Sequence, residues 1–140
     1  MATPLHDAPV PIRLKLAALW TSLMFCYIYG DYFDLFRPGN LQDMLAGNMG
    51  PLGPVTQNIL LGTTVLLAIP AVMIFLCVSL PATWNRWVNM LLGVLYAMVM
   101  AVSMPGSWHF YQLLGVIEIV ISLLITGYAF RWPRASIAAT

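Results

Sequence analysis

Four long apolar segments, at about residues 16–36, 57–80, 87–104 and 110–130, dominate this sequence. An α-helix needs about 20 mostly apolar residues to cross the ~30 Å hydrocarbon core of a bilayer. Only 8% of the 140 residues are charged and 61% are hydrophobic, whereas a soluble domain carries about 25% charged residues. So few charges cannot cover a globular surface, and the composition therefore predicts that lipid surrounds most of the chain.

Proline and glycine separate the four segments. The two turns, Pro81–Arg86 and Pro105–His109, are short, and only the loop Arg37–Thr56 is longer. We therefore expect an all-α fold, an antiparallel four-helix transmembrane bundle with a short amphipathic surface helix in the first loop. Pro70 lies within the second span, where it frees a backbone carbonyl group and is expected to kink the helix.

The domain boundaries follow from the same segments. A single four-helix transmembrane domain is expected over residues 13–134. A poorly ordered cytoplasmic tail is expected at 1–12, where three prolines occur among polar residues, and a second cytoplasmic tail at 135–140.

The basic residues predict the orientation of the bundle. Cytoplasmic loops of membrane proteins carry an excess of Lys and Arg. With the N-terminus inside, only Arg37 lies outside, and five basic residues are cytoplasmic: Arg13, Lys15, Arg86, Arg131 and Arg134. The sequence thus predicts a multi-pass protein of the bacterial cytoplasmic membrane with both termini in the cytoplasm.

The first loop is punctuated by Gly47, Gly50 and Gly53, which exclude a continuous helix. Asn40 followed by Asp43 resembles a helix N-cap with its acidic partner. We expect a short surface helix over 41–45 that covers a pocket, with the glycines as hinges. Aromatic residues near the same end of the bundle either line this pocket or form an aromatic girdle with ordinary bundle packing: Tyr27, Tyr29, Tyr32, Phe33, Trp108 and Tyr111.

Glu118 is the acidic residue placed deepest in the membrane, roughly 12 Å below the outer interface at 1.5 Å per residue. An intramembrane acid costs about 2.5–3.5 kcal/mol on insertion scales and is a functional candidate by default. Helical spacing places Tyr111, Gly115, Glu118, Ser122 and Thr126 on one small, polar stripe that faces other helices. Our hypothesis is that Glu118 is often protonated and hydrogen-bonded to a tyrosine or serine. The structural alternative is a neutral residue that fixes helix register.

On the first span, Tyr27, Asp31 and Asp34 share one face. Asp31 and Glu118 are expected to meet inside the outer half of the bundle, whereas the inner half is nearly all apolar. The candidate ligand- or proton-binding residues are Glu118, Asp31, Asp34, Tyr27, Tyr111, His109 and Ser122. For the two aspartates the alternative is a simple helix end that meets water, and for His109 an interfacial position.

Several classes of function are excluded or disfavoured. A net charge of +1 does not supply the basic face that nucleic acid requires. Cys26 and Cys77 form no C-x-x-C motif and are expected to act as small apolar residues. Among the candidate residues only Asp31 and Asp34 have a ligand spacing within one helix. We therefore expect no metal, no cofactor and no catalytic residue.

The strings KLAALW at 15–20, YIYGDYF at 27–33, GPLGP at 50–54 and MPGSW at 104–108 resemble a family of small bacterial four-helix membrane proteins of unassigned function. This resemblance covers nearly the whole chain from Lys15 to Pro133 and implies a fold without a chemistry. The architecture is also loosely similar to the DoxX-like group. Small multidrug transporters carry a membrane carboxylate in their first helix, whereas the deepest acid here is in the fourth.

Three functions remain. The first is a protein that binds or transports a small apolar ligand, a cation or a proton at Glu118 and Asp31 from the outer side. The second is a non-catalytic accessory subunit of a larger membrane complex, or a homo-oligomer, with Gly93, Ala97 and Ala101 forming an interface between helices. The third, and least supported, is a membrane enzyme that acts on a lipid-like substrate with Glu118 or His109 as acid or base.

Overall fold

The computed structural model describes residues 8–133, which form an all-α bundle. Its elements are α1 (Ile12–Asp34), α2 (Asn40–Leu45), the 3-10 helix η1 (Gly50–Leu52), α3 (Gln57–Ser79), α4 (Ala82–Ser103) and α5 (His109–Phe130). Four of the helices, of 22 or 23 residues, are long and apolar enough to cross a membrane. The fold class predicted from the sequence is therefore confirmed, and the chain is a multi-pass membrane protein whose apolar outer side chains contact lipid. Most of both expected tails, and Arg134, lie outside the described residues.

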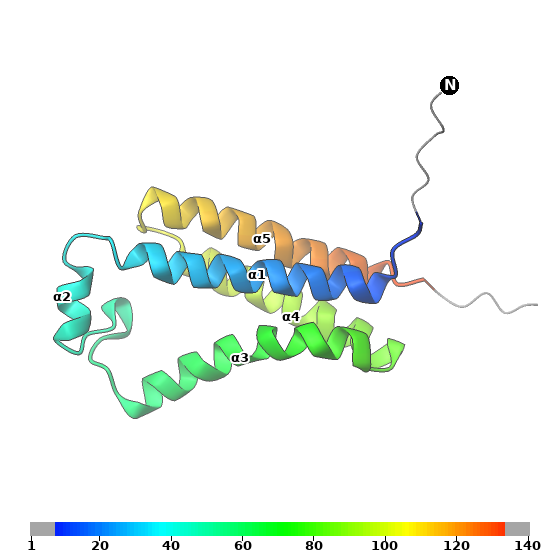
Figure 1. Ribbon diagram of the computed structural model, residues 1–140, viewed down its shortest axis with the longest axis horizontal. Helices are drawn as coiled ribbons and strands as arrows, with labels where there is room; N and C mark the ends of the chain where they lie inside the picture. Colours follow the sequence, from blue (N-terminus) through cyan, green and yellow to red (C-terminus); the bar gives the residue numbers. More distant parts are fainter. Residues whose placement is uncertain (1–7, 134–140) are drawn as a thin grey trace, which may run out of the picture.

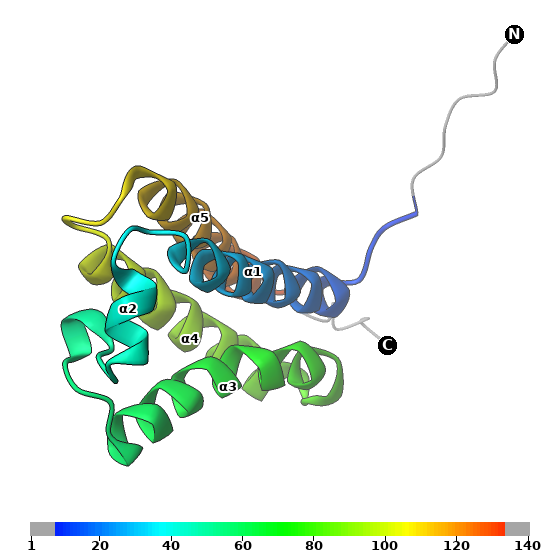
Figure 2. The ribbon, with the colours of Figure 1, turned by 60° about the vertical axis from the view of Figure 1, so that its left-hand side comes forward.

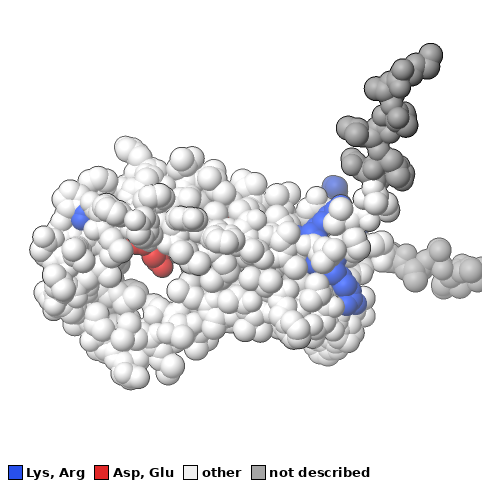
Figure 3. All heavy atoms as spheres, in the orientation of Figure 1, with Lys and Arg blue, Asp and Glu red and all other residues white. Residues whose placement is uncertain are grey.

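The four long helices run antiparallel (Figures 1 and 2). α1 packs against both α3 and α5, and α4 packs against α5. We call the end of the bundle that holds Ile12 and Phe130 the basic end, and the end that holds Asp34 and α2 the loop end. Lys and Arg gather at the basic end, with a single basic patch visible at the loop end (Figure 3).

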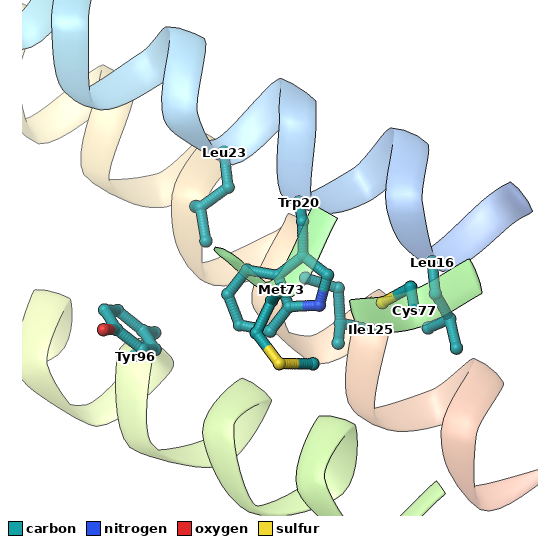
Figure 4. Close-up of a cluster of buried hydrophobic side chains, with 7 residues drawn as sticks. All are labelled: Leu16, Trp20, Leu23, Met73, Cys77, Tyr96 and Ile125. Carbon is teal, nitrogen blue, oxygen red and sulfur yellow. The ribbon is translucent and has the colours of Figure 1, made fainter. Parts of the chain in front are cut away.

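The apolar core lies toward the basic end and receives side chains from every long helix (Figure 4). The Trp20 and Tyr96 rings meet edge to face, with their centroids 5.8 Å apart. The buried members of the cluster are Leu16, Trp20, Leu23, Met73, Cys77, Tyr96 and Ile125. This core fixes the relative positions of the four helices and leaves the loop end less tightly packed.

Small residues let α4 and α5 approach closely. A Cβ atom on Gly93 would lie 2.8 Å from the carbonyl oxygen of Ser122, so only glycine fits at this crossing. Ala97, one turn further along α4, is also buried, whereas Ala101 is exposed. The close contact between α4 and α5 thus includes Gly93 and Ala97 of the small-residue series, and Ala101 lies outside it.

α4 begins at Ala82, and the prediction of a turn over Pro81–Arg86 is therefore wrong. Asn85 lies in the first turn of this helix. Its side chain is buried and donates a hydrogen bond from Nδ2 to the carbonyl oxygen of Cys77. That carbonyl cannot be paired within α3, because the residue four positions later is Pro81, which has no N–H. Pro81 is thus the N-cap of α4, and it leaves the Cys77 carbonyl group free to accept a hydrogen bond from Asn85.

The basic half of the bundle contains a buried polar network, which corrects the expectation of an apolar inner half. Trp20 donates from Nε1 to Oδ1 of Asn89 over 2.7 Å, and the thiol of Cys77 lies 3.4 Å from the same oxygen. Asn89 in turn donates from Nδ2 to the side-chain oxygen of Asn85 over 2.7 Å. Cys77 is thus part of a hydrogen-bonded group as well as of the apolar core.

α3 has two unlike halves. Its buried residues are Pro70, Met73 and Cys77, and none precedes the proline. The helix bends along its length (Figure 1), as the sequence predicted for a proline in this position. The carbonyl oxygen of Leu66, which Pro70 cannot pair, accepts a hydrogen bond of 2.6 Å from the Tyr96 hydroxyl.

The first loop contains the predicted short helix, but its start differs. The N-cap is Gly39, with a φ of 85°, and not Asn40. The Asn40 side chain instead donates from Nδ2 to the carbonyl oxygen of Asp34 over 3.0 Å and to its carboxylate over 2.8 Å. Asn40 therefore ties the loop back to the end of α1, which stops at Asp34 instead of continuing to residue 36.

Candidate functional site

A cavity of about 300 Å³ lies toward the loop end, between all four long helices and η1. Its polar lining residues are Tyr27, Asp31, Thr63, Tyr96, Ser103, Tyr111 and Glu118, and its other lining residues are Gly30, Met49, Leu52, Leu66, Leu67, Val99 and Met100. Figure 3 shows a hollow in the same region, with acidic atoms beside it. A mostly apolar cavity with a few convergent polar groups has the composition of a small-molecule site.

Glu118 reaches this cavity from the middle of α5 and is 4% exposed. The position of α5 is set one turn earlier by Gly115, where a Cβ atom would lie 2.6 Å from the methyl carbon of Met100. The carboxyl oxygen Oε2 of Glu118 is buried without a hydrogen-bond partner. The hydrogen bond to tyrosine or serine that the sequence predicted is not formed among the described residues, although Tyr27, Tyr96 and Tyr111 line the same cavity.

Asp31 lines the same cavity from α1, and its side chain is more exposed than that of Glu118. The neighbouring Gly30 is buried against α5, where a Cβ atom would lie 3.7 Å from Leu114. The structure thus brings the two acids that the sequence singled out to one cavity, from two different helices. No hydrogen bond joins the two carboxyl groups among the described residues.

Three tyrosines accompany the acids: Tyr27 from α1, Tyr96 from α4 and Tyr111 from α5. The ring centroids of Tyr27 and Tyr96 are 6.4 Å apart. Tyr96 was not predicted as a site residue from the sequence. Pro70 does indicate that a donor is needed, because a proline in a membrane helix leaves a backbone carbonyl group without its N–H partner. Which helix supplies that donor depends on the packing, and a tyrosine in an apolar span gives no local sign of it.

Three of the predicted site residues lie elsewhere. Asp34 pairs with Arg37 at 3.4 Å between Oδ1 and Nε, because the loop returns to the end of α1. His109 is exposed at the first position of α5. Ser122 is buried, but it lies against α4 near Gly93 and does not line the cavity.

The expected lid also differs. Met49, which precedes η1, and Leu52, its last residue, line the cavity, whereas no residue of the surface helix α2 does. Gly47, Gly50 and Gly53 have φ angles of 74°, 52° and 79°, so glycine is required at each of these joints. η1 therefore replaces α2 as the part of the loop that lies over the cavity.

The expected aromatic lining is divided between two places. Tyr29 and Tyr32 are exposed on the outer surface of α1. Phe33 and Trp108 line a separate hollow of about 380 Å³ together with Phe36, Arg37 and Phe110. Of the aromatic residues expected in the pocket, only Tyr27 and Tyr111 line the main cavity.

The residues with charged side chains that line the cavity are all acidic. The cavity is lined by two carboxylic acids and by no Lys, Arg or His. Across residues 8–133, no group of three or more His, Cys, Asp or Glu side chains is placed to hold a metal ion. The arrangement can therefore attract a positive charge to Glu118 and Asp31 without competition from a basic residue that lines the same cavity.

The comparisons with known proteins add a family. The model of a family of unknown function, DUF6326, matches residues 11–139. No curated protein and no solved structure matches the chain.

Proposed function

The chain belongs to DUF6326, a family of unknown function, and we propose that it is a membrane protein that binds a small cationic ligand in the cavity at Glu118. The observation that carries this proposal is the Glu118 carboxyl group: it is buried, its residue lines the cavity, and its Oε2 has no hydrogen-bond partner among the described residues. An isolated buried charge is costly, and buried charges in proteins are therefore paired with an opposite charge. A cation supplied by the ligand would provide that partner, and Asp31 in the same cavity would add to the attraction.

The same observation disfavours the structural alternative for Glu118. A neutral carboxyl group that fixes helix register needs a hydrogen-bond partner on another helix. Oε2 has none among the described residues, although Ser122 is only one helical turn away on α5 and its hydroxyl is also unpartnered. Glu118 therefore contributes little to the packing that would justify the cost of burying it.

The proposal includes an orientation. The basic end carries Arg13, Lys15, Arg86 and Arg131, and the loop end carries Arg37. The excess of positive charge at the basic end supports a cytoplasmic location for that end, in the cytoplasmic membrane. The cavity then lies in the outer half of the bilayer, and the ligand reaches it from the outer side.

The proposal is tested by measuring the equilibrium binding of benzylammonium to the full-length protein in lipid nanodiscs. We expect saturable binding that Glu118→Gln, which removes the charge and keeps the shape, weakens at least tenfold. The matched control is Asp43→Asn, because Asp43 is an exposed acid on α2 outside the cavity. Wild-type affinity in Glu118→Gln would refute the proposal. Fixed-stoichiometry co-purification with a large membrane partner, unaffected by Glu118→Gln, would instead support the accessory-subunit alternative.

A further inference from the structure

We infer that the preferred ligand is an organic ammonium ion with apolar substituents, which the rings of Tyr27, Tyr96 and Tyr111 surround while Glu118 balances its charge. This inference rests on the proposed function and names the class of cation. A proton, a hydrated alkali ion and a divalent metal ion are the competing occupants. The size, aromatic content and oxygen content of the cavity distinguish among them.

The size of the cavity favours an organic ligand. Small-molecule sites begin at about 300 Å³, and the cavity has about 300 Å³. A dehydrated metal ion occupies only a small part of such a volume, and a proton needs no cavity at all. The space beside Glu118 therefore matches a molecule of several heavy atoms.

The oxygen content of the cavity is low for a metal ion. Ca²⁺ takes six to eight oxygen ligands, and Mg²⁺ requires a nearly complete octahedron. The lining offers only two charged oxygen ligands, the carboxyl groups of Glu118 and Asp31 on different helices, and its other side-chain oxygens are neutral hydroxyl groups, those of Thr63, Ser103 and the three tyrosines. In the described part of the chain, residues 8–133, no group of three or more His, Cys, Asp or Glu side chains is placed to hold a metal ion. A hard cation would lose more of its hydration shell than the oxygen atoms of the lining replace.

The tyrosines supply what a soft, poorly hydrated cation needs. The face of an aromatic ring attracts an ammonium group within about 6 Å of its centroid, and several such rings together recognise quaternary ammonium groups. Tyr27, Tyr96 and Tyr111 come from three different helices to the cavity that Glu118 faces, and the first two rings are 6.4 Å apart. Rings and carboxylate thus surround one space from several sides.

The remaining walls suit the substituents of such an ion. Leu66 and Leu67 of α3, Val99 and Met100 of α4, and Leu52 of η1 give the cavity an apolar surface. Methyl, ethyl or benzyl groups attached to nitrogen would bury apolar area here, at a gain of roughly 25 cal/mol per Å². The recognised class is therefore an amphiphilic amine, with quaternary nitrogen preferred over primary because its methyl groups add apolar area that the rings and these walls can bury.

The experiment compares benzyltrimethylammonium with neopentylbenzene, its uncharged isostere, and with benzylammonium and sodium ions, on the same full-length protein in nanodiscs. We expect benzyltrimethylammonium to bind at least tenfold more tightly than the uncharged isostere and more tightly than benzylammonium. Tyr27→Phe should change this affinity less than about twofold, because the ring remains, whereas Tyr27→Leu should weaken it at least tenfold. The matched control is Tyr29→Leu, because Tyr29 lies two residues away on the outer surface of α1.

The outcomes separate this inference from the proposed function. Glu118-dependent binding of benzylammonium or sodium, with no effect of Tyr27→Leu and no preference for the quaternary ion, would overturn the inference alone. Binding of benzyltrimethylammonium that depends on Tyr27 but not on Glu118 would overturn the proposed function, and with it the charge balance by Glu118, while leaving the contact with the tyrosine rings. No binding of any cation would overturn both. Should Tyr27→Leu fail to fold, the pair Tyr111→Phe and Tyr111→Leu gives the same test from α5.

Discussion

The hydroxyl group of Tyr96 on α4 donates a hydrogen bond of 2.6 Å to the carbonyl oxygen of Leu66 on α3. Leu66 lies four residues before Pro70, so its carbonyl has no N–H partner within the helix. Pro70 thus leaves a carbonyl group unpaired in α3, and Tyr96 supplies its hydrogen-bond donor from α4. Tyr96 also lines the cavity.

Tyr96→Phe is expected to lower the free energy of unfolding by about 1 kcal/mol, because hydrogen bonds between membrane helices contribute up to about 1.7 kcal/mol. Unfolding of the protein in mixed micelles measures the change. In a Pro70→Ala background the N–H of residue 70 can pair with Leu66, so Tyr96→Phe should then cost less. Equal costs in the two backgrounds would show that the proline and the tyrosine are not coupled.

Asn85→Leu is expected to destabilise the protein by about 1–3 kcal/mol, because it leaves the Cys77 carbonyl buried and unpaired. It also removes one of the two acceptors of Asn89 Nδ2, leaving the backbone carbonyl oxygen of residue 85, and Asn89 accepts the hydrogen bond from Trp20. The loss should appear in micelle unfolding and as a change in tryptophan fluorescence. Asn58→Leu is the control, because Asn58 is exposed in the first turn of α3; a similar loss there would contradict the explanation.

Gly93→Ala is expected to destabilise the protein by about 1–3 kcal/mol through overpacking, because its new Cβ atom would lie 2.8 Å from the Ser122 carbonyl oxygen. Gly127→Ala is the matched control within α5, since nothing lies within 4 Å of its added Cβ atom. Glycine in a helix costs about 0.5–1 kcal/mol relative to alanine, so this control should be neutral or stabilising. Equal unfolding midpoints for the two variants would refute the close approach of α4 and α5.

The affinity for benzyltrimethylammonium is expected to rise with pH, by up to about tenfold per pH unit, where the cation and a proton compete for Glu118. The other titratable groups that line the cavity are Asp31 and the tyrosines Tyr27, Tyr96 and Tyr111. Glu118→Gln should remove the dependence, and Asp31→Asn should leave most of it. Binding should also diminish the infrared absorption of a protonated carboxyl group in the wild type. A pH dependence that survives Glu118→Gln would assign the competing proton elsewhere.

The fold could be predicted because its causes are local. Length, apolar content and the positions of proline and glycine located four spans, and a helix through Pro70 was expected to bend. The start of α4 at Ala82 was missed, although the helix was expected from residue 87, because Pro81 can equally well start a helix or a turn. What distinguishes the two is the burial of Asn85 against α3, a contact between helices that no local pattern records.

The candidate site was predicted in part for the same reason. Glu118 and Asp31 stood out because lipid penalises a carboxyl group wherever the helix faces, and they line one cavity. Asp34 shares a helical face with Asp31, but α1 ends there, and Arg37 and Asn40 contact its carboxylate. The partners of an end residue are set by the course of the loop, and helical periodicity carries no information about that course.

The unequal halves of α3 bear on how selective the cavity can be. Every buried residue of this helix is at Pro70 or beyond, while Thr63, Leu66 and Leu67 before it form one wall of the cavity. That wall is joined to α4 by the bond between Leu66 and Tyr96. A ligand too bulky for the cavity could thus enter if the half of α3 before Pro70 tilted about the proline. This tilt would break one hydrogen bond and leave the core in place. Such a wall would favour tolerance of substituent size, so that selection in the proposed function would rest on the carboxyl group of Glu118 and the rings of Tyr27 and Tyr111.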